Sequence, residues 1–182
     1  MDLHANQIQG FFDIPVDNLF AAPTFVGHIK KYIKSKNIVC VAPDVGGVER
    51  ARAIGKRLSA DLAIIDKRRS GPGKSEVMNV IGNVKNKTCI IIDDLVDSGG
   101  TIVNAATALK NKGAKDVYAY VVHGVLTGEA VKKINKSKIK KFVISNSILN
   151  DKKIGRSAKF QIINVGTLLA EAIKRISISK SV

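Results

Sequence analysis

From Pro23 onward, short runs of β-branched and other apolar residues alternate with longer amphipathic stretches. This alternation is typical of a parallel sheet whose strands are joined by helices, because each parallel connection must cross back over the sheet. The apolar runs predict strands near 38–42, 61–65, 88–92, 117–121, 141–145 and 160–163. The stretches between them predict helices near 24–35, 47–58, 99–112, 127–136 and 166–176. The sequence therefore predicts an α/β fold with a parallel sheet flanked by helices.

The stretch 166–176 has the clearest helical period. Its apolar residues recur at the spacing of one helix face: Leu168, Leu169, Ala172, Ile173 and Ile176. Lys174 and Arg175 lie near the C-terminal end, where the helix dipole favours cations. We expect this apolar face to pack in the core.

The length and composition favour one globular domain. A chain of 182 residues, 45% hydrophobic and 25% charged, is too short for two ordinary enzyme domains and too apolar to be disordered. No apolar run reaches the ~18 residues of a membrane span, and the segment from Met1 to His4 lacks the features of a signal peptide. We therefore predict a cytoplasmic protein that makes no membrane contact.

The two cysteines, Cys40 and Cys89, each lie within an apolar run. Buried free thiols are the simplest interpretation of such positions. The sequence predicts no disulfide.

The formal net charge is +15, from 30 Lys and Arg against 15 Asp and Glu. Such an excess suggests nucleic acid, anionic membranes or phosphorylated substrates as partners and does not choose among them. Only seven basic residues are Arg, and the chain is rich in Ile, Lys and Asn, so compositional drift is favoured over nucleic-acid binding. The stretch Lys132–Lys159, with ten of the thirty basic residues, is expected to be a solvated helix face and loop.

The most informative segment runs from Ile90 to Thr101: an apolar strand, two adjacent carboxylates and a turn of small residues into a helix. In an open parallel sheet, ligands bind beyond the carboxyl ends of strands, and a following helix N-terminus presents unpaired N–H groups to phosphate. Gly99 and Gly100 let the backbone approach a ligand closely, and the Ser98 hydroxyl can donate to phosphate oxygens.

Asp93, Asp94 and Asp97 need a different role, because carboxylates do not bind phosphate directly. They can accept hydrogen bonds from sugar hydroxyls or hold Mg²⁺ through oxygen ligands. The alternative, a capped helix after a buried strand, explains a single Asp better than this group of three.

The run from Asp93 to Thr101 resembles the ribose-5-phosphate-binding signature shared by phosphoribosyltransferases and phosphoribosyl pyrophosphate synthetases. The segment Asp2–Leu19 resembles a signature that only the synthetases carry. Further matches follow in the synthetase order: Ala42–Ala51, Ile65–Arg69, Val77–Gly82, His123–Gly128 and Leu168–Ile173. The chain is therefore similar to the C-terminal half of the ribose-phosphate pyrophosphokinase family. The resemblance implies a phosphoribosyltransferase-type (type I) parallel sheet flanked by helices.

The resemblance also implies a reaction, the transfer of diphosphate from ATP to the C1 hydroxyl of ribose 5-phosphate. It implies that ribose 5-phosphate is bound by Asp93, Asp94, Asp97, Ser98, Gly99, Gly100 and Thr101. It implies a diphosphate loop at Asp44, Val45, Gly46 and Gly47, whose glycines expose backbone N–H groups. Without the family match, the alternative for this second segment is an ordinary strand-to-helix turn.

Further roles follow from the same resemblance. His4 and Asp44 would hold Mg²⁺ that bridges the ATP phosphates. Lys67 and Arg69 would be catalytic cations that stabilise charge on the transferring oxygens, at the start of a mobile loop, Ser70–Ser75. A bare Lys-Arg-Arg run would otherwise be interpreted as a solvated edge.

Family members carry a second, similar α/β domain that precedes the matched region. We expect residues 1–22 to be a remnant of the signature that closes that domain, and residues 23–182 to form the phosphoribosyltransferase-like domain. The apolar side chains at Phe11, Phe12, Leu19 and Phe20 then call for a partner, either another copy of the chain or a separately encoded N-terminal domain. Two alternatives to an enzyme stay open: a noncatalytic ribose-phosphate-binding or regulatory module, and a nucleic-acid-binding protein.

Overall fold

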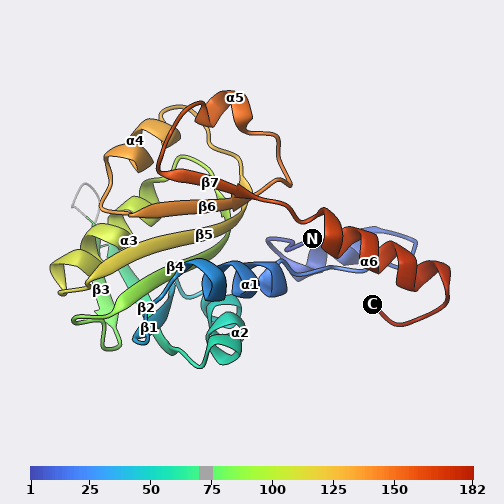
Figure 1. Cartoon of the computed structure of the whole chain (residues 1–182), viewed down its shortest axis with the longest axis horizontal. Coiled ribbons are helices and arrows are strands. Elements are labelled where there is room, and N and C mark those ends of the chain that lie inside the picture. Colours follow the sequence, from blue (N-terminus) through green and yellow to red (C-terminus); the bar gives the residue numbers. More distant parts are fainter. Residues whose placement is uncertain (70–75) are drawn as a thin grey trace.

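The structure is a computed structural model that describes residues 1–69 and 76–182. Within these residues, seven strands form one sheet in the order β3-β2-β1-β4-β5-β6-β7 (Figure 1). The parallel strands are β1 (Ile38–Ala42), β2 (Asp61–Arg69), β4 (Thr88–Val96), β5 (Asp116–Gly124), β6 (Lys141–Ser145) and β7 (Phe160–Ile163). The edge strand β3 (Glu76–Ile81) pairs antiparallel with β2.

Helices cover both faces of the sheet (Figure 1). On one face lie α1 (Ala22–Tyr32) and α2 (Val48–Leu58), whose buried residues pack with Cys40, Ile92 and Tyr120 of the strands. On the other face α3 (Gly100–Asn111), α4 (Ala130–Lys136) and the short α5 (Asp151–Ile154) enclose a second apolar cluster. Because the central strands are buried on both faces, nearly every residue in them is apolar, and they form continuous apolar runs in the sequence. The predicted fold class is confirmed.

All six predicted strands and all five predicted helices are present, but three strands, β2, β4 and β5, are longer than expected. Strand β4 continues to Val96 because β5 continues beside it, with Asp93 opposite Val121. The expected strand end at residue 92 is therefore wrong, and the two carboxylates lie inside the strand. Strand β2 reaches Arg69 because β3 pairs with it. The sequence analysis missed β3, α5 and a 3₁₀ helix, η1 (Asn6–Phe11).

The expected core packing of α6 (Gly166–Ser177) is wrong. Only Ala172 is buried in this helix, and Ile173 is 67% exposed. The helix leaves the edge strand β7 and extends away from the sheet, on the side where residues 1–20 lie (Figure 1). Helical periodicity defines an apolar face, but it does not specify which surface covers that face.

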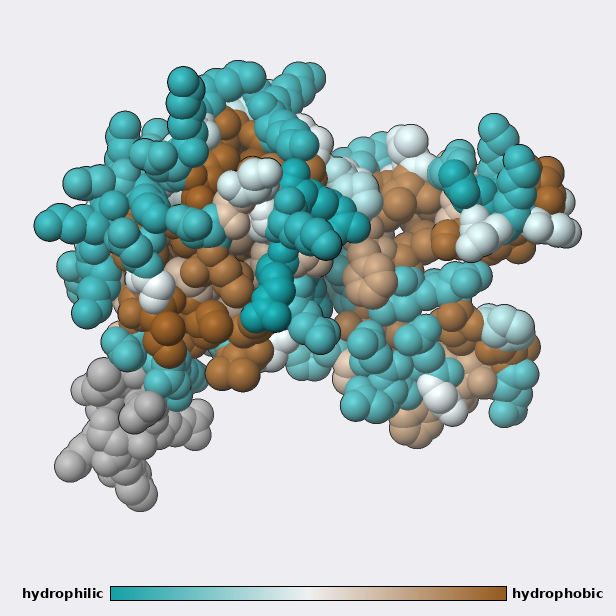
Figure 2. Space-filling model, turned by 90° about the horizontal axis from the view of Figure 1, so that it is seen from below, coloured by the Kyte–Doolittle hydropathy of each residue, from teal (hydrophilic) through white to brown (hydrophobic). Residues whose placement is uncertain are grey.

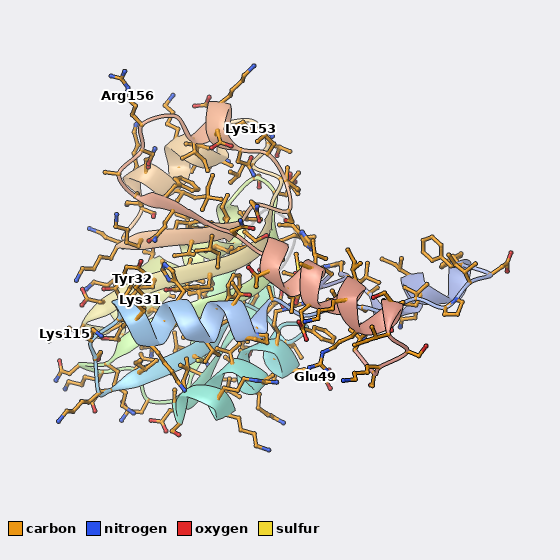
Figure 3. The ribbon with its side chains drawn as sticks, turned by 45° about the vertical axis from the view of Figure 1, so that its right-hand side comes forward. Lys31, Tyr32, Glu49, Lys115, Lys153 and Arg156 are labelled. Carbon is orange, nitrogen blue, oxygen red and sulfur yellow. The ribbon has the colours of Figure 1, made fainter. Side chains whose placement is uncertain are left out.

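The lysine-rich stretch is solvent-exposed, as expected, with one exception. Arg156 points outward in Figure 3, whereas Lys153 is exposed but donates to the Val125 carbonyl at 2.7 Å. Lys159 is half-buried and donates to the Ser137 carbonyl at 2.8 Å. Burial lowers its pKa.

Both cysteines are buried free thiols, which confirms that prediction. Among the described helices, none combines the length and apolar character that crossing a membrane requires.

Candidate active site

The carboxyl edge of the sheet has a switch point between β1 and β4. The chain passes from β1 into α2 on one face and from β4 into α3 on the other face. These two strands are neighbours, with Val41 opposite Ile91. In open α/β sheets, ligands bind in the crevice that such a reversal creates. The two turns predicted to bind phosphates, after β1 and after β4, therefore lie side by side.

The turn after β1 is held by its own carboxylate. The Gly47 N–H donates to Asp44 Oδ1 at 2.9 Å, and α2 begins one residue later. Asp44, Val45 and Gly46 are exposed, whereas Gly47 is buried. The loop thus offers an exposed backbone and an oriented carboxylate at the switch point.

The turn after β4 requires glycine. Gly99 has a φ of 77°, a left-handed conformation that side chains rarely adopt, and it leads into α3 at Gly100. No side chain caps this helix. Asp97 points instead toward the β5–α4 connection, where its Oδ1 accepts the Thr127 hydroxyl at 2.6 Å. Since Ser98 is also exposed, the first turn of α3 presents N–H groups and a hydroxyl to solvent.

Asp93 and Asp94 form a buried carboxyl pair inside β4. The Asp94 side chain is 5% exposed, and that of Asp93 is 16% exposed. Burial, strengthened by the neighbouring Asp94, raises the pKa of Asp93 to about 8. Burial would also raise the pKa of Asp94, but the hydrogen bond from His4 and the charge of Arg50 outweigh it, so this pKa is lowered. One proton is therefore held at Asp93, while Asp94 is ionised.

Two side chains from distant parts of the chain converge on these carboxyls. His4 Nδ1 lies 2.8 Å from Asp94 Oδ2. Arg50, on α2, places Nη2 3.5 Å from Asp94 Oδ2 and Nη1 3.9 Å from Asp93 Oδ1. Its Nε lies 3.8 Å from Asp2 Oδ1. The structure thus brings His4 to the predicted ribose-binding carboxylates.

Residues 1–21 are closed into a loop by Asp2 and tied to the sheet by His123. The Asp2 N–H donates to the Leu19 carbonyl at 2.8 Å, and Asp2 Oδ2 accepts the Ala21 N–H at 2.7 Å. His123 Nε2, on β5, lies 3.0 Å from the Met1 carbonyl. His123 Nδ1 pairs with the Ser147 hydroxyl at 2.9 Å. These contacts fix the segment that carries His4.

Lys67 lies near the same edge, on β2 next to β1. Ala42, the last residue of β1, is opposite Ile64, so Lys67 follows three residues beyond that pair. Its side chain is half-buried. The side chain of Arg69 and the predicted loop Ser70–Ser75 lie outside the described part of the structure.

The residues predicted to hold Mg²⁺ are His4 and Asp44. Among residues 1–69 and 76–182, no group of three or more His, Cys, Asp or Glu side chains could hold a metal ion. Mg²⁺ usually keeps several waters and binds proteins through one or two carboxylates together with substrate phosphates. The exposed, oriented carboxylate of Asp44, beside a loop open to phosphate, fits that mode.

A cleft of about 680 Å³ opens beside His4, between residues 1–20, α2 and α6. Arg50 and Arg57 line it on the α2 side, and Glu171 and Arg175 line it on the α6 side. Figure 2 shows a hollow on this side of the molecule, with apolar surface on the projecting segments around it.

Arg50, Asp2 and His123 are the residues that the sequence analysis left without a role. Each lies within a segment quoted for the family resemblance, but none has a local signal of function. In the sequence, Arg50 is one of several charged residues on an amphipathic helix whose C-terminal turn is basic. Its importance depends on carboxyls that are 43 and 44 residues away in the sequence, at Asp93 and Asp94.

The doubly wound sheet and its paired turns at the β1–β4 switch define an α/β protein of the phosphoribosyltransferase type. The crystal structure of phosphoribosylpyrophosphate synthetase from Mycobacterium smegmatis matches 98% of this chain and 57% of its own, with a TM-score of 0.88 and 35% identity. The family model for the phosphoribosyl synthetase-associated domain matches residues 68–182. The chain belongs to the phosphoribosyl synthetase family.

Two curated relatives cover all of this chain. Ribose-phosphate pyrophosphokinase of Bradyrhizobium diazoefficiens is 56% identical over 183 residues, and that of Agrobacterium fabrum is 53% identical over 182 residues. The chain spans 57% and 59% of the length of these two relatives. The family resemblance predicted from the sequence is confirmed.

Proposed function

We propose that the chain takes part in ribose-phosphate diphosphokinase chemistry, the transfer of diphosphate from ATP to the C1 hydroxyl of ribose 5-phosphate. The products are phosphoribosyl pyrophosphate and AMP. The observation that carries the proposal is the uncapped start of α3, which follows β4 at the switch point of a sheet that belongs to this family. The chain spans 57% of the length of its Bradyrhizobium relative.

The 5-phosphate of the sugar is proposed to bind the turn Asp97–Thr101. The first N–H groups of α3 and the hydroxyls of Ser98 and Thr101 are the donors that phosphate needs. Asp97 fixes the turn through Thr127. Asp93, protonated at neutral pH, and Asp94 are proposed to lie toward the ribose hydroxyls.

The diphosphate is proposed to bind the loop Asp44–Gly47, and Lys67 and Arg69 are proposed to stabilise the charge on its transferring oxygens. Mg²⁺, held by His4 and Asp44, would neutralise the ATP phosphates. The protein's own contribution is to hold the two reactants in line, an effect that reaches about 7–11 kcal/mol in well-oriented reactions. No side chain need form a covalent intermediate.

Ribose 5-phosphate binding tests the phosphate site. At Gly100, an added Cβ would meet only Ser98 Oγ at 3.9 Å, so a larger side chain grows into open space in front of the turn. We expect Gly100→Leu to abolish binding in calorimetry while the chain stays folded. Gly27→Leu is the matched control, because Gly27 is an exposed helical glycine with open space around its Cβ position. Unchanged affinity in Gly100→Leu would place the phosphate elsewhere.

AMP formation from ATP, ribose 5-phosphate and Mg²⁺ tests the reaction. We expect the chain alone to turn over far more slowly than a full-length relative. Activity should rise when the part of the Bradyrhizobium relative that this chain does not match is added. Robust turnover by the chain alone would contradict the expected need for the unmatched part of the relative. Loss of that turnover in Lys67→Ala would support the catalytic role proposed for Lys67.

Two further parts of the proposal concern the chain's surroundings. Exposed apolar residues at Phe11 and Phe12 favour a homo-oligomer or a separate N-terminal domain as partner. The use of ATP is consistent with the cytoplasmic location predicted from the sequence. A noncatalytic ribose-phosphate-binding module is the alternative, and it predicts intact sugar-phosphate binding with no AMP formed in either mixture.

A further inference from the structure

Asp94 is shared between two side chains that the sequence keeps far apart. His4 Nδ1 and Arg50 Nη2 both approach the same atom, Asp94 Oδ2, at 2.8 and 3.5 Å. The carboxylate is almost fully buried, whereas the His4 side chain is 73% exposed and lines the 680 Å³ cleft. Asp94 therefore fixes an otherwise solvated imidazole at the edge of a cavity.

The contact determines which nitrogen of His4 carries the proton. An ionised carboxylate can only accept hydrogen bonds, so the proton of a neutral ring must lie on Nδ1. The lone pair is then on Nε2. This is the arrangement in which a carboxylate behind a histidine prepares the opposite nitrogen for a metal or another electrophile.

Arg50 holds the Asp94 carboxylate in the position that contacts His4. Its guanidinium, 20% exposed, lies within 4 Å of Asp2, Asp93 and Asp94 at once. A buried carboxylate beside a second carboxyl is costly without a cation, so without Arg50 the Asp94 side chain would turn away from His4. The planar fork of arginine reaches several carboxylates in fixed directions, which a lysine cannot do.

We propose that Arg50 is a positioning residue that acts through Asp94 to hold the proton of His4 on Nδ1 and leave Nε2 free toward the metal-bound nucleotide. The nature of the ligand rests on the proposed function, whereas the effect of Arg50 on His4 does not. Arg50 itself touches no substrate in this role.

The tautomer of His4 is the direct test. Long-range ¹H–¹⁵N correlation spectra distinguish the protonated from the unprotonated nitrogen of each imidazole and so identify its tautomer. His4→Gln assigns the signals of His4. We expect the Nδ1–H form in the wild-type chain and its loss in Arg50→Met. Arg52→Met is the matched control, because Arg52 lies on the same helix and is exposed.

Two results would overturn the proposal: a His4 signature in Arg50→Met identical to that of the wild type, or the same change in Arg52→Met. If Arg50→Met does not fold, Arg50→Gln takes its place, because glutamine retains hydrogen-bonding groups without the charge or the fork. Retention of the Nδ1–H form in a folded Arg50→Gln chain would likewise overturn the proposal.

Nucleotide binding in the same variants separates this inference from the proposed function. We expect Arg50→Met to weaken the affinity for Mg²⁺–ATP at least tenfold, about 1.4 kcal/mol. A changed tautomer with unchanged Mg²⁺–ATP affinity would support the role of Arg50 in positioning His4 and contradict the use of His4 for the nucleotide.

Discussion

Alanine at Gly99 and alanine at Gly100 should have opposite effects on stability, although the two residues are adjacent. Gly99 has a φ of 77°, and an alanine Cβ there would lie 3.4 Å from both Cγ1 and Cδ1 of the buried Ile134. A non-glycine residue held in a sparsely populated backbone region costs about 1–3 kcal/mol. The contact with the buried Ile134 is of ordinary van der Waals length, so the cost comes from the backbone conformation.

Gly100 lacks both constraints. It is the first residue of α3, its φ is not left-handed, and its Cβ position is open. Replacing such a glycine by alanine restricts the unfolded chain and stabilises by about 0.4–1 kcal/mol. For a chain of this size, each kcal/mol moves the midpoint of thermal unfolding by about 2–4 °C.

Differential scanning calorimetry measures both effects. We expect a lowered Tm for Gly99→Ala and an equal or higher Tm for Gly100→Ala. Equal destabilisation by the two alanine variants would refute the conformation assigned to this turn, and with it the geometry of the proposed phosphate site.

Three further predictions follow from burial and exposure. Burial raises the pKa of Cys40 and Cys89 to about 12, so neither thiol should react with a maleimide until the chain unfolds, and rapid labelling of the native chain would contradict their placement. Because the folded-state pKa of Asp93, about 8, lies above its ordinary 3.8, the wild type should lose stability relative to Asp93→Asn as the pH rises between these values. Urea unfolding across that range measures the difference in the free energy of unfolding between the wild type and Asp93→Asn, which should level off above pH 8. A difference that does not change with pH would argue against the raised pKa of Asp93. With Phe11 87% and Ile173 67% exposed, the chain should self-associate in sedimentation, and Phe11→Asp with Ile173→Asp should reduce association; a wild-type monomer at every concentration would count against it.

The sheet could be predicted from the sequence because its central strands are buried on both faces. Runs such as Ile90–Ile92 leave few alternatives to a parallel strand, and the helices between them show the 3.6-residue period. The end of β4 could not be predicted, since Asp93 and Asp94 interrupt the apolar run. The strand continues only because β5 offers a partner, which is tertiary information.

The edge strand β3 and the helix α6 show the limits of local patterns. β3 pairs with a neighbouring strand on one side only, and its sequence, Glu76–Ile81, is a short mixture of polar and apolar residues. In α6 the period was predicted correctly, but the burial of Ile173 was not, because nothing in the pattern identifies a covering surface.

The turns of the candidate site could be located from small residues after apolar runs, whereas the carboxyl network could not. Gly99 and Gly100 can be recognised in the sequence because small residues after an apolar run indicate a turn. Arg50 joins the network only when α2, β4 and the first residues of the chain are assembled. A local sequence pattern carries no information about contacts between distant parts of the chain.

The contacts of residues 1–4 span much of the chain, and this has a consequence for the order of folding. His4 meets Asp94 across 90 residues, and the Met1 carbonyl meets His123 across 122 residues. Closing such long loops costs entropy that only later contacts recover, so these pairs form late. During synthesis the first residues emerge long before β4 and β5 exist. The chain should therefore assemble its sheet first and the candidate site last, so an incompletely made or partly refolded chain would have a native-like sheet without that site.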